Sequence, residues 1–195
     1  MKIIFAIELN DEKEEVSKQT ISSLKGKKYL TVTKENFLSE TKKILPTAFD
    51  SVVLIPNNSI LNENYIEICS VYQTEDSILL PLVILNSEKI NGVLNTCLWN
   101  TNLTGTIGQL DHELAVKQID LTLYGAIIPL KYLIEENFNK EIKYYGDFYF
   151  LNKVTKNDIN VIGAPKTLLT TEIDLTFSSI PNDERIKYFN MAKEV

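Results

Sequence analysis

The chain has 195 residues, of which 44% are hydrophobic and 24% charged, so it is long enough for one globular domain with a core of its own. Its net charge is −6 and Arg185 is its single arginine, which argues against a nucleic-acid backbone or an anionic membrane surface as the main partner. No stretch approaches the about 20 apolar residues of a membrane-spanning helix, and we expect a cytoplasmic protein. The abundance of Lys, Asn and Ile is typical of an AT-rich genome, such as those of many bacteria and their phages.

The first 60 residues alternate between apolar runs and helical patterns. Strands are expected at residues 2–9, 29–33 and 51–55, and helices at 11–24 and 37–45. This β-α-β-α-β order implies a parallel sheet with right-handed crossovers, in which ligands bind beyond the carboxyl ends of the strands. Those ends carry the polar residues Glu8, Asn10, Glu35, Asn57 and Asn58.

The rest of the chain continues with the same mixture of elements. A helix is expected at 62–72 and a long strand at 77–85, where Pro81 favours an edge position or a bulge. The remaining elements expected are loop with short strands at 86–110, strands at 121–128 and 160–164, and helices at 131–136, 147–154 and 182–195. The predicted fold class is therefore α/β: one domain of three α/β/α layers around a mostly parallel central sheet.

Two segments resemble GT-A glycosyltransferases of the family 2 type. The first is residues 124–133 (YGAIIPLKYL), followed by Asn137-Phe138-Asn139 in place of a G-x-F-D/N turn and by Gly146-Asp147-Phe148-Tyr149-Phe150 in place of an acidic E-D-x-x-F helix start. The second is residues 51–61 (SVVLIPNNSIL), which resembles the strand that leads to the D-x-D motif of that family.

The resemblance implies one GT-A-like domain over residues 1–195. Its nucleotide-binding half would span 1–85, its acceptor-binding half 86–165 and a C-terminal extension 166–195. The donor would be a nucleotide sugar, bound on the side of Glu8, Asn10, Glu35, Asn57 and Asn58. Asp147 matches the carboxylate that takes the proton from the acceptor hydroxyl in inverting members of the family.

The D-x-D position departs from the pattern of the family. In GT-A enzymes its carboxylates hold a divalent cation, Mn²⁺ or Mg²⁺, against the diphosphate of the donor. Here the position reads Pro56-Asn57-Asn58, whose amide oxygens can ligate a metal but bring no charge. Asn58 is therefore a weak metal-ligand candidate, and we expect the metal to bind weakly or not at all.

Each candidate also has a simpler structural explanation. Asp147 is suited to cap the helix that it begins, and Asp111-His112-Glu113 to a solvated turn, since neighbouring side chains point apart. Cys69 and Cys97 lack metal-site spacing and are expected as buried free thiols. The sequence thus predicts a glycosyltransferase or, alternatively, a non-catalytic GT-A-like module that binds protein partners in a larger assembly, such as a phage particle or an envelope complex. An unrelated α/β nucleotide-binding protein is a third alternative.

Overall fold

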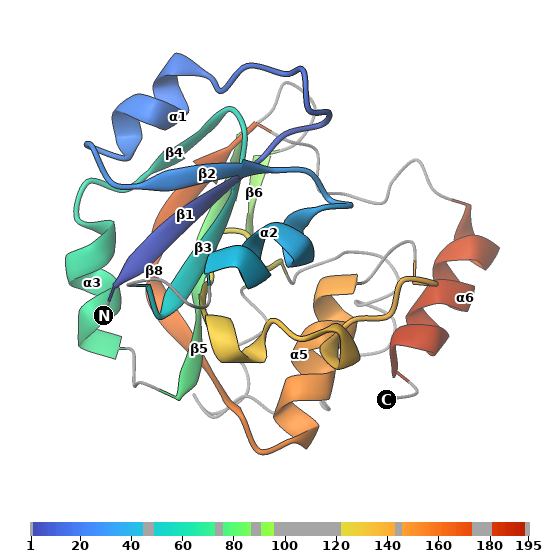
Figure 1. Cartoon of the computed structure of the whole chain (residues 1–195). Coiled ribbons are helices and arrows are strands. Elements are labelled where there is room, and N and C mark those ends of the chain that lie inside the picture. The colour runs from blue at the N-terminus through green and yellow to red at the C-terminus, as the bar shows by residue number, and fades with distance from the viewer. Residues whose placement is uncertain are drawn as a thin grey trace.

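A mixed sheet forms the centre of the protein (Figure 1). The computed structural model describes residues 2–44, 49–72, 76–86, 91–95, 122–142, 146–172 and 181–193. Within them the strand order is β2-β1-β3-β7-β5-β8-β4, with β6 paired to β5. The strands are β1 (Ile3–Glu8), β2 (Tyr29–Val32), β3 (Ser51–Pro56), β4 (Ser59–Leu61), β5 (Ser77–Asn86), β6 (Asn91–Leu94), β7 (Ile127–Pro129) and β8 (Asn160–Thr171).

Helices cover both faces of this sheet, with α1 and α3 on one side and α2, α5 and α6 on the other (Figure 1). They are α1 (Lys18–Ser23), α2 (Phe37–Ile44), α3 (Tyr65–Tyr72), α5 (Gly146–Lys156) and α6 (Asn182–Lys193), and two 3₁₀ turns, η3 (Leu130–Tyr132) and η4 (Glu135–Asn137), follow β7. The three-layer α/β/α prediction is confirmed. None of the helices in the described part of the chain is both long and apolar enough to span a bilayer.

The alternation of β1 shows how one strand supplies two cores. Phe5 and Ile7 belong to the buried cluster that includes Tyr65 and Cys69 of α3. Ile4 and Ala6 belong to the opposite cluster, which includes residues of α2, α5 and α6. Successive side chains of a strand point to opposite faces, so these apolar runs are buried on both sides.

Parallel pairing joins β1 to both β2 and β3, as the β-α-β-α-β prediction requires. Glu8 lies opposite Val32 of β2 and Pro56 of β3, so the carboxyl ends of these three strands meet at one edge of the sheet. Parallel pairing also joins β5 to β8, whereas β7, β4 and β6 pair antiparallel with their neighbours. The antiparallel pairs make the sheet mixed around its parallel N-terminal part.

Pro81 lies inside β5, which pairs with β7, β8 and β6 and so is an interior strand. The register against β8 shifts on either side of Leu82. Of the two positions that the sequence left open for Pro81, the bulge is therefore the one that the structure has.

The helix expected at 11–24 begins only at Lys18. Ser17 caps it by accepting a hydrogen bond from the Thr20 amide at 3.2 Å, and the residues before Ser17 form a turn and loop. The loop is held by Asn57, which is far away in the sequence, so its conformation depends on a contact that helical periodicity does not report.

The strand expected at 121–128 is mostly a turn. The Ala126 amide donates to the Leu123 carbonyl at 3.0 Å, and Gly125 has a φ of 73°, so β7 begins only at Ile127. A φ above zero at the third position of a turn is what glycine permits. The expected helix at 131–136 is likewise replaced by η3 and η4, and β8 extends beyond the expected 160–164.

Candidate functional site

Glu8 ends β1 at the edge where the parallel strands finish. Its carboxylate is half-buried, and its Oε1 accepts a hydrogen bond from the Tyr124 hydroxyl at 2.8 Å. Burial raises the pKa of Glu8, the Tyr124 hydroxyl opposes this, and the nearby charge of Asp147 raises the pKa further. Glu8 is thus a carboxyl group whose charged form is disfavoured by its surroundings.

Asp147 occupies the first turn of α5. Its Oδ2 accepts a hydrogen bond from the Leu123 amide at 2.9 Å. Burial raises the pKa of Asp147, while the Leu123 amide, the Thr122 side chain and the charge of Lys34 act in the opposite direction. The side chain is therefore tied to the segment before β7.

The fold brings Glu8 and Asp147 together from two distant parts of the chain. Asp147 acts on Glu8 by charge, as do Lys34 and Glu35, which follow β2 and are exposed. Three sequence-predicted residues, Glu8, Glu35 and Asp147, therefore belong to one electrostatic cluster on the side of α2 and α5. Lys34 supplies a positive charge to this cluster.

Asn57 has different partners. It is buried, and its Oδ1 accepts from the Ser17 amide at 2.9 Å while its Nδ2 donates to Glu14 Oε1 at 2.7 Å and to the Glu15 carbonyl at 3.0 Å. Glu14 also accepts from the Asn10 amide at 2.6 Å. The Asn57 side chain therefore fastens the loop before α1.

Asn58 lies beside Asn57 in the turn between β3 and β4. It is exposed and has a φ of 59°, a left-handed conformation that asparagine tolerates. Asn10 is exposed at the start of the loop that Glu14 holds. The two residues lie near the carboxyl edge of the sheet, and their role in nucleotide binding stays a prediction.

Asn57 and Asn58, which the sequence predicts at the D-x-D position, do not fit a Mn²⁺ or Mg²⁺ site. Such ions take several oxygen ligands, usually including carboxylates. Both amide atoms of Asn57 are engaged within the protein, which leaves only the exposed amide of Asn58. The described ranges also contain no group of three or more His, Cys, Asp or Glu side chains arranged to hold a metal.

Three residues of this region escape sequence analysis: Glu14, Thr122 and Tyr124. Glu14 lies in a run of charges that resembles a helix start, so its partner Asn57 is invisible in the sequence. Thr122 and Tyr124 lie in an apolar run that resembles a strand, where Gly125 is the available signal of a turn.

Several other sequence candidates lie outside the described residues. They are Cys97, Asp111, His112 and Glu113. The other cysteine, Cys69, is a buried free thiol as expected, and burial raises its pKa to about 12.

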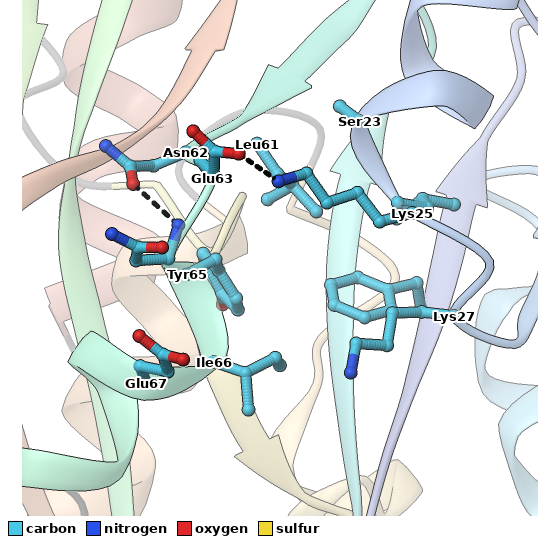
Figure 2. A pocket seen from close by; sticks show the side chains of 12 residues that line it. Ser23, Lys25, Lys27, Leu61, Asn62, Glu63, Tyr65, Ile66 and Glu67 are labelled. Atoms are coloured by element: carbon cyan, nitrogen blue, oxygen red, sulfur yellow. Dashed lines mark hydrogen bonds and ion pairs between the residues drawn. The ribbon is translucent and has the colours of Figure 1, made fainter.

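A pocket of about 230 Å³ lies between the end of α1 and the start of α3 (Figure 2). Lys25 reaches across it to form an ion pair with Glu63, and Asn62 accepts a hydrogen bond from the Asn64 amide at 3.0 Å. The pocket is smaller than the about 300 Å³ of a typical ligand site and is partly bridged by this ion pair. It belongs to the α1 and α3 side of the sheet, whereas Glu8 and Asp147 belong to the other.

Comparison with known proteins identifies the fold. No protein-family model and no curated protein sequence matches the chain. Among solved structures, A197 from STIV matches with a TM-score of 0.54 and 13% identity over 89% of this chain and 87% of that one. S. aureus TarS matches with a TM-score of 0.57 and 13% identity, and its residues 1–349 in complex with UDP-GlcNAc with 0.58 and 13%.

The chain has a GT-A glycosyltransferase-like fold. The predicted resemblance is confirmed at the level of the fold, which is all that an identity of 13% shows. The match covers 98% of this chain in both TarS structures, but only 39% of the TarS chain and 65% of the 1–349 chain.

Proposed function

We propose that this GT-A-like protein transfers a sugar from a nucleotide sugar to an acceptor hydroxyl, with Asp147 as the catalytic base. The observation that carries the proposal is the half-buried Asp147 carboxylate, which the Leu123 amide holds and whose pKa burial raises. Perturbed carboxyl groups that gather at one sheet edge are typical of functional sites. TarS has been crystallised with UDP-GlcNAc and with UDP, which supports a nucleotide sugar as the class of donor.

In the proposed reaction the acceptor oxygen forms a bond to the anomeric carbon of the donor sugar. The proton of the acceptor hydroxyl passes to Asp147, the bond from the anomeric carbon to the diphosphate oxygen breaks, and the diphosphate leaves with the electron pair. A raised pKa makes the ionised Asp147 a stronger base than an exposed aspartate. Lys34 is placed to offset negative charge near the two carboxylates.

Glu8, Asn10, Glu35 and Asn58 remain the residues proposed for the nucleotide side. Asn57 would act there through the loop that it holds, since its amide is already bonded to Ser17, Glu14 and Glu15. No step in this scheme depends on a divalent metal. We place the protein in the cytoplasm, in keeping with the free thiol of Cys69.

The alternative is a non-catalytic GT-A-like module that binds protein partners in a larger assembly. Asn57 favours this alternative, because a residue at the position of the metal-binding motif is bonded to the protein's own loop instead. A module of this kind would keep the fold while having no need to bind a donor.

Thermal unfolding in the presence of donors separates the two functions. UDP-GlcNAc, UDP-glucose and other sugar nucleotides are titrated to millimolar concentration, with and without Mn²⁺, against matched free sugars as controls. A donor at about 100 times its dissociation constant adds about 2.7 kcal/mol, or about 5–10 °C in midpoint for a chain of this size. We expect a shift with one class of donor. The absence of a shift with every donor would contradict the transferase and favour the module.

A further inference from the structure

A single turn, residues 122–126, bonds to both carboxylates of the candidate site. The Leu123 amide donates to Asp147, and the hydroxyl of the next residue, Tyr124, donates to Glu8. The Thr122 hydroxyl accepts from the Tyr124 amide at 3.2 Å, and the Thr122 side chain lowers the pKa of Asp147. Two consecutive residues, Leu123 and Tyr124, thus bond to two acids that come from β1 and α5.

Asn95, which directly follows β6, fixes the start of this turn. The residue is 1% exposed, and its Oδ1 accepts from the Thr122 amide at 2.9 Å. Its Nδ2 donates to the Pro81 carbonyl at 2.7 Å and to the Thr122 carbonyl at 3.3 Å. The Thr122 peptide is therefore fastened to the irregular part of β5 through one buried amide.

The other end of the turn is fixed by hydrogen bonds to both β3 and α3. The Gly125 amide donates to the Leu54 carbonyl of β3 at 2.7 Å, and its carbonyl accepts from the Tyr65 hydroxyl of α3 at 2.6 Å. A Cβ atom on Gly125 would lie 3.2 Å from Pro81 Cγ and 3.3 Å from Leu169 Cβ. Backbone, side chains and packing together leave the turn little freedom to move.

We propose that the 122–126 turn is a positioning element for the two acids. Its Leu123 amide, with the Thr122 side chain beside it, orients Asp147, and its Tyr124 hydroxyl orients Glu8. The turn that Asn95 fixes thereby sets the two carboxylates relative to each other. The inference rests on the proposed function, because it takes Asp147 as the base. Orientation of a base toward its substrate is a large part of what an enzyme site supplies. Hydrogen bonds from a fixed turn provide that orientation without adding charge.

The pKa of each carboxyl group depends on a different set of neighbours. Glu8 is faced by Tyr124, Asp147, Lys34 and Glu35, and Asp147 by Leu123, Thr122 and Lys34. The Tyr124 hydroxyl lowers the pKa of Glu8, and the Leu123 amide and the Thr122 side chain lower the pKa of Asp147. Removing the hydroxyl of either Thr122 or Tyr124 should therefore raise the pKa of one of the two carboxyl groups more than that of the other.

The test follows both carboxyl groups by ¹³C NMR as the pH is varied, in the wild type and in four variants. Thr122→Val should raise the titration midpoint of Asp147 more than that of Glu8, and Thr122→Ser should restore it because serine keeps the hydroxyl. Tyr124→Phe should raise the midpoint of Glu8 more than that of Asp147. Tyr132→Phe is the matched control, because its hydroxyl donates to the Asp76 carbonyl at 3.1 Å outside the site.

The inference is overturned if Thr122→Val and Tyr124→Phe unfold at lower temperature but leave both titrations as in Tyr132→Phe, since the two residues would then be merely structural. The NMR titration needs no enzymatic activity, so its result tests the positioning of the carboxylates separately from the proposed function. Where transfer is measured, Thr122→Val should lower kcat about tenfold with little change in the KM of the donor. A change confined to KM would contradict positioning of the base.

Discussion

Two half-buried acids, Glu8 and Asp147, define the site at the scale of single residues. Each has a raised pKa for which burial is the largest cause, and each retains hydrogen-bond donors that favour its charged form. Burial makes each carboxylate a stronger base, and the hydrogen-bond donors orient it. Burying a charged carboxylate also lowers the stability of the folded state at neutral pH. A surface aspartate would bring neither property.

The raised pKa of Asp147 makes a prediction about stability and pH. Folding raises this pKa above its ordinary value of 3.8, so the native state binds the proton more tightly than the unfolded chain. The resulting stability is fully present below that ordinary value and is lost as the pH rises through the raised pKa. Asp147→Asn should therefore lose less stability than the wild type between pH 4 and pH 7, as urea denaturation at each pH would show.

The exposed Glu63 is the control for this measurement, since its ion pair with Lys25 lowers its pKa. Glu63→Gln should change the pH dependence in the opposite direction, because the stability it removes is present at neutral pH and lost on acidification. If the free energy of unfolding depended on pH in the same way for Asp147→Asn and the wild type, the Asp147 carboxyl would titrate in the folded protein as it does in the unfolded chain.

At the scale of elements, the 122–126 turn decides the geometry of the site, and Gly125 decides the turn. Gly125 has a φ of 73° and a crowded Cβ position. Gly26 has a φ of 75° and no atom within 4 Å of its Cβ position. The two glycines therefore share the backbone conformation and differ in packing.

Gly125→Ala should destabilise the protein more than Gly26→Ala. Both variants force a non-glycine residue into the left-handed region, at a cost of about 1–2 kcal/mol. Only Gly125→Ala also presses on Pro81 and Leu169, which adds about 1 kcal/mol or more. Chemical denaturation measures both, and equal losses would show that the turn yields without strain.

Some helices, strands and turns can be predicted from the sequence, and others cannot. Strands β1 and β3 are predictable because their unbroken apolar runs report burial on both faces, and α5 because Asp147 precedes a helical pattern. The start of α1 and the 122–126 turn are not, because each depends on distant partners. Asn57 bonds to Ser17 and Asn95 bonds to Thr122, pairs that no local pattern contains.

The residues of the candidate site likewise include some that the sequence predicts and some that it does not. Asp147 and Glu8 are predictable from a resemblance and from the position of a strand end. Tyr124, Thr122 and Glu14 are not, since their importance lies in which residue each one bonds to. Hydrogen-bond partners are a property of the folded chain, and so they appear only with the structure.

At the scale of the whole molecule, a GT-A-like fold holds two different arrangements at one sheet edge. On the side of α5, carboxylates gather around Tyr124 and Lys34. On the side of α1, Asn57, predicted to stand at the position of the D-x-D motif, holds a loop through its side chain. We propose that this chain keeps the chemistry of the acceptor side and binds its donor without a metal held by that motif.

Turnover of the sugar nucleotide that binds tests this account most directly. Release of UDP, or of the nucleotide from whichever donor shifts the unfolding midpoint, is measured with a panel of hydroxyl acceptors for the wild type and Asp147→Asn. We predict turnover by the wild type, a loss of about 100-fold or more in Asp147→Asn and an unchanged midpoint shift with donor in both. Equal turnover by the two proteins would contradict the role of Asp147, and the absence of turnover despite donor binding would contradict a transferase.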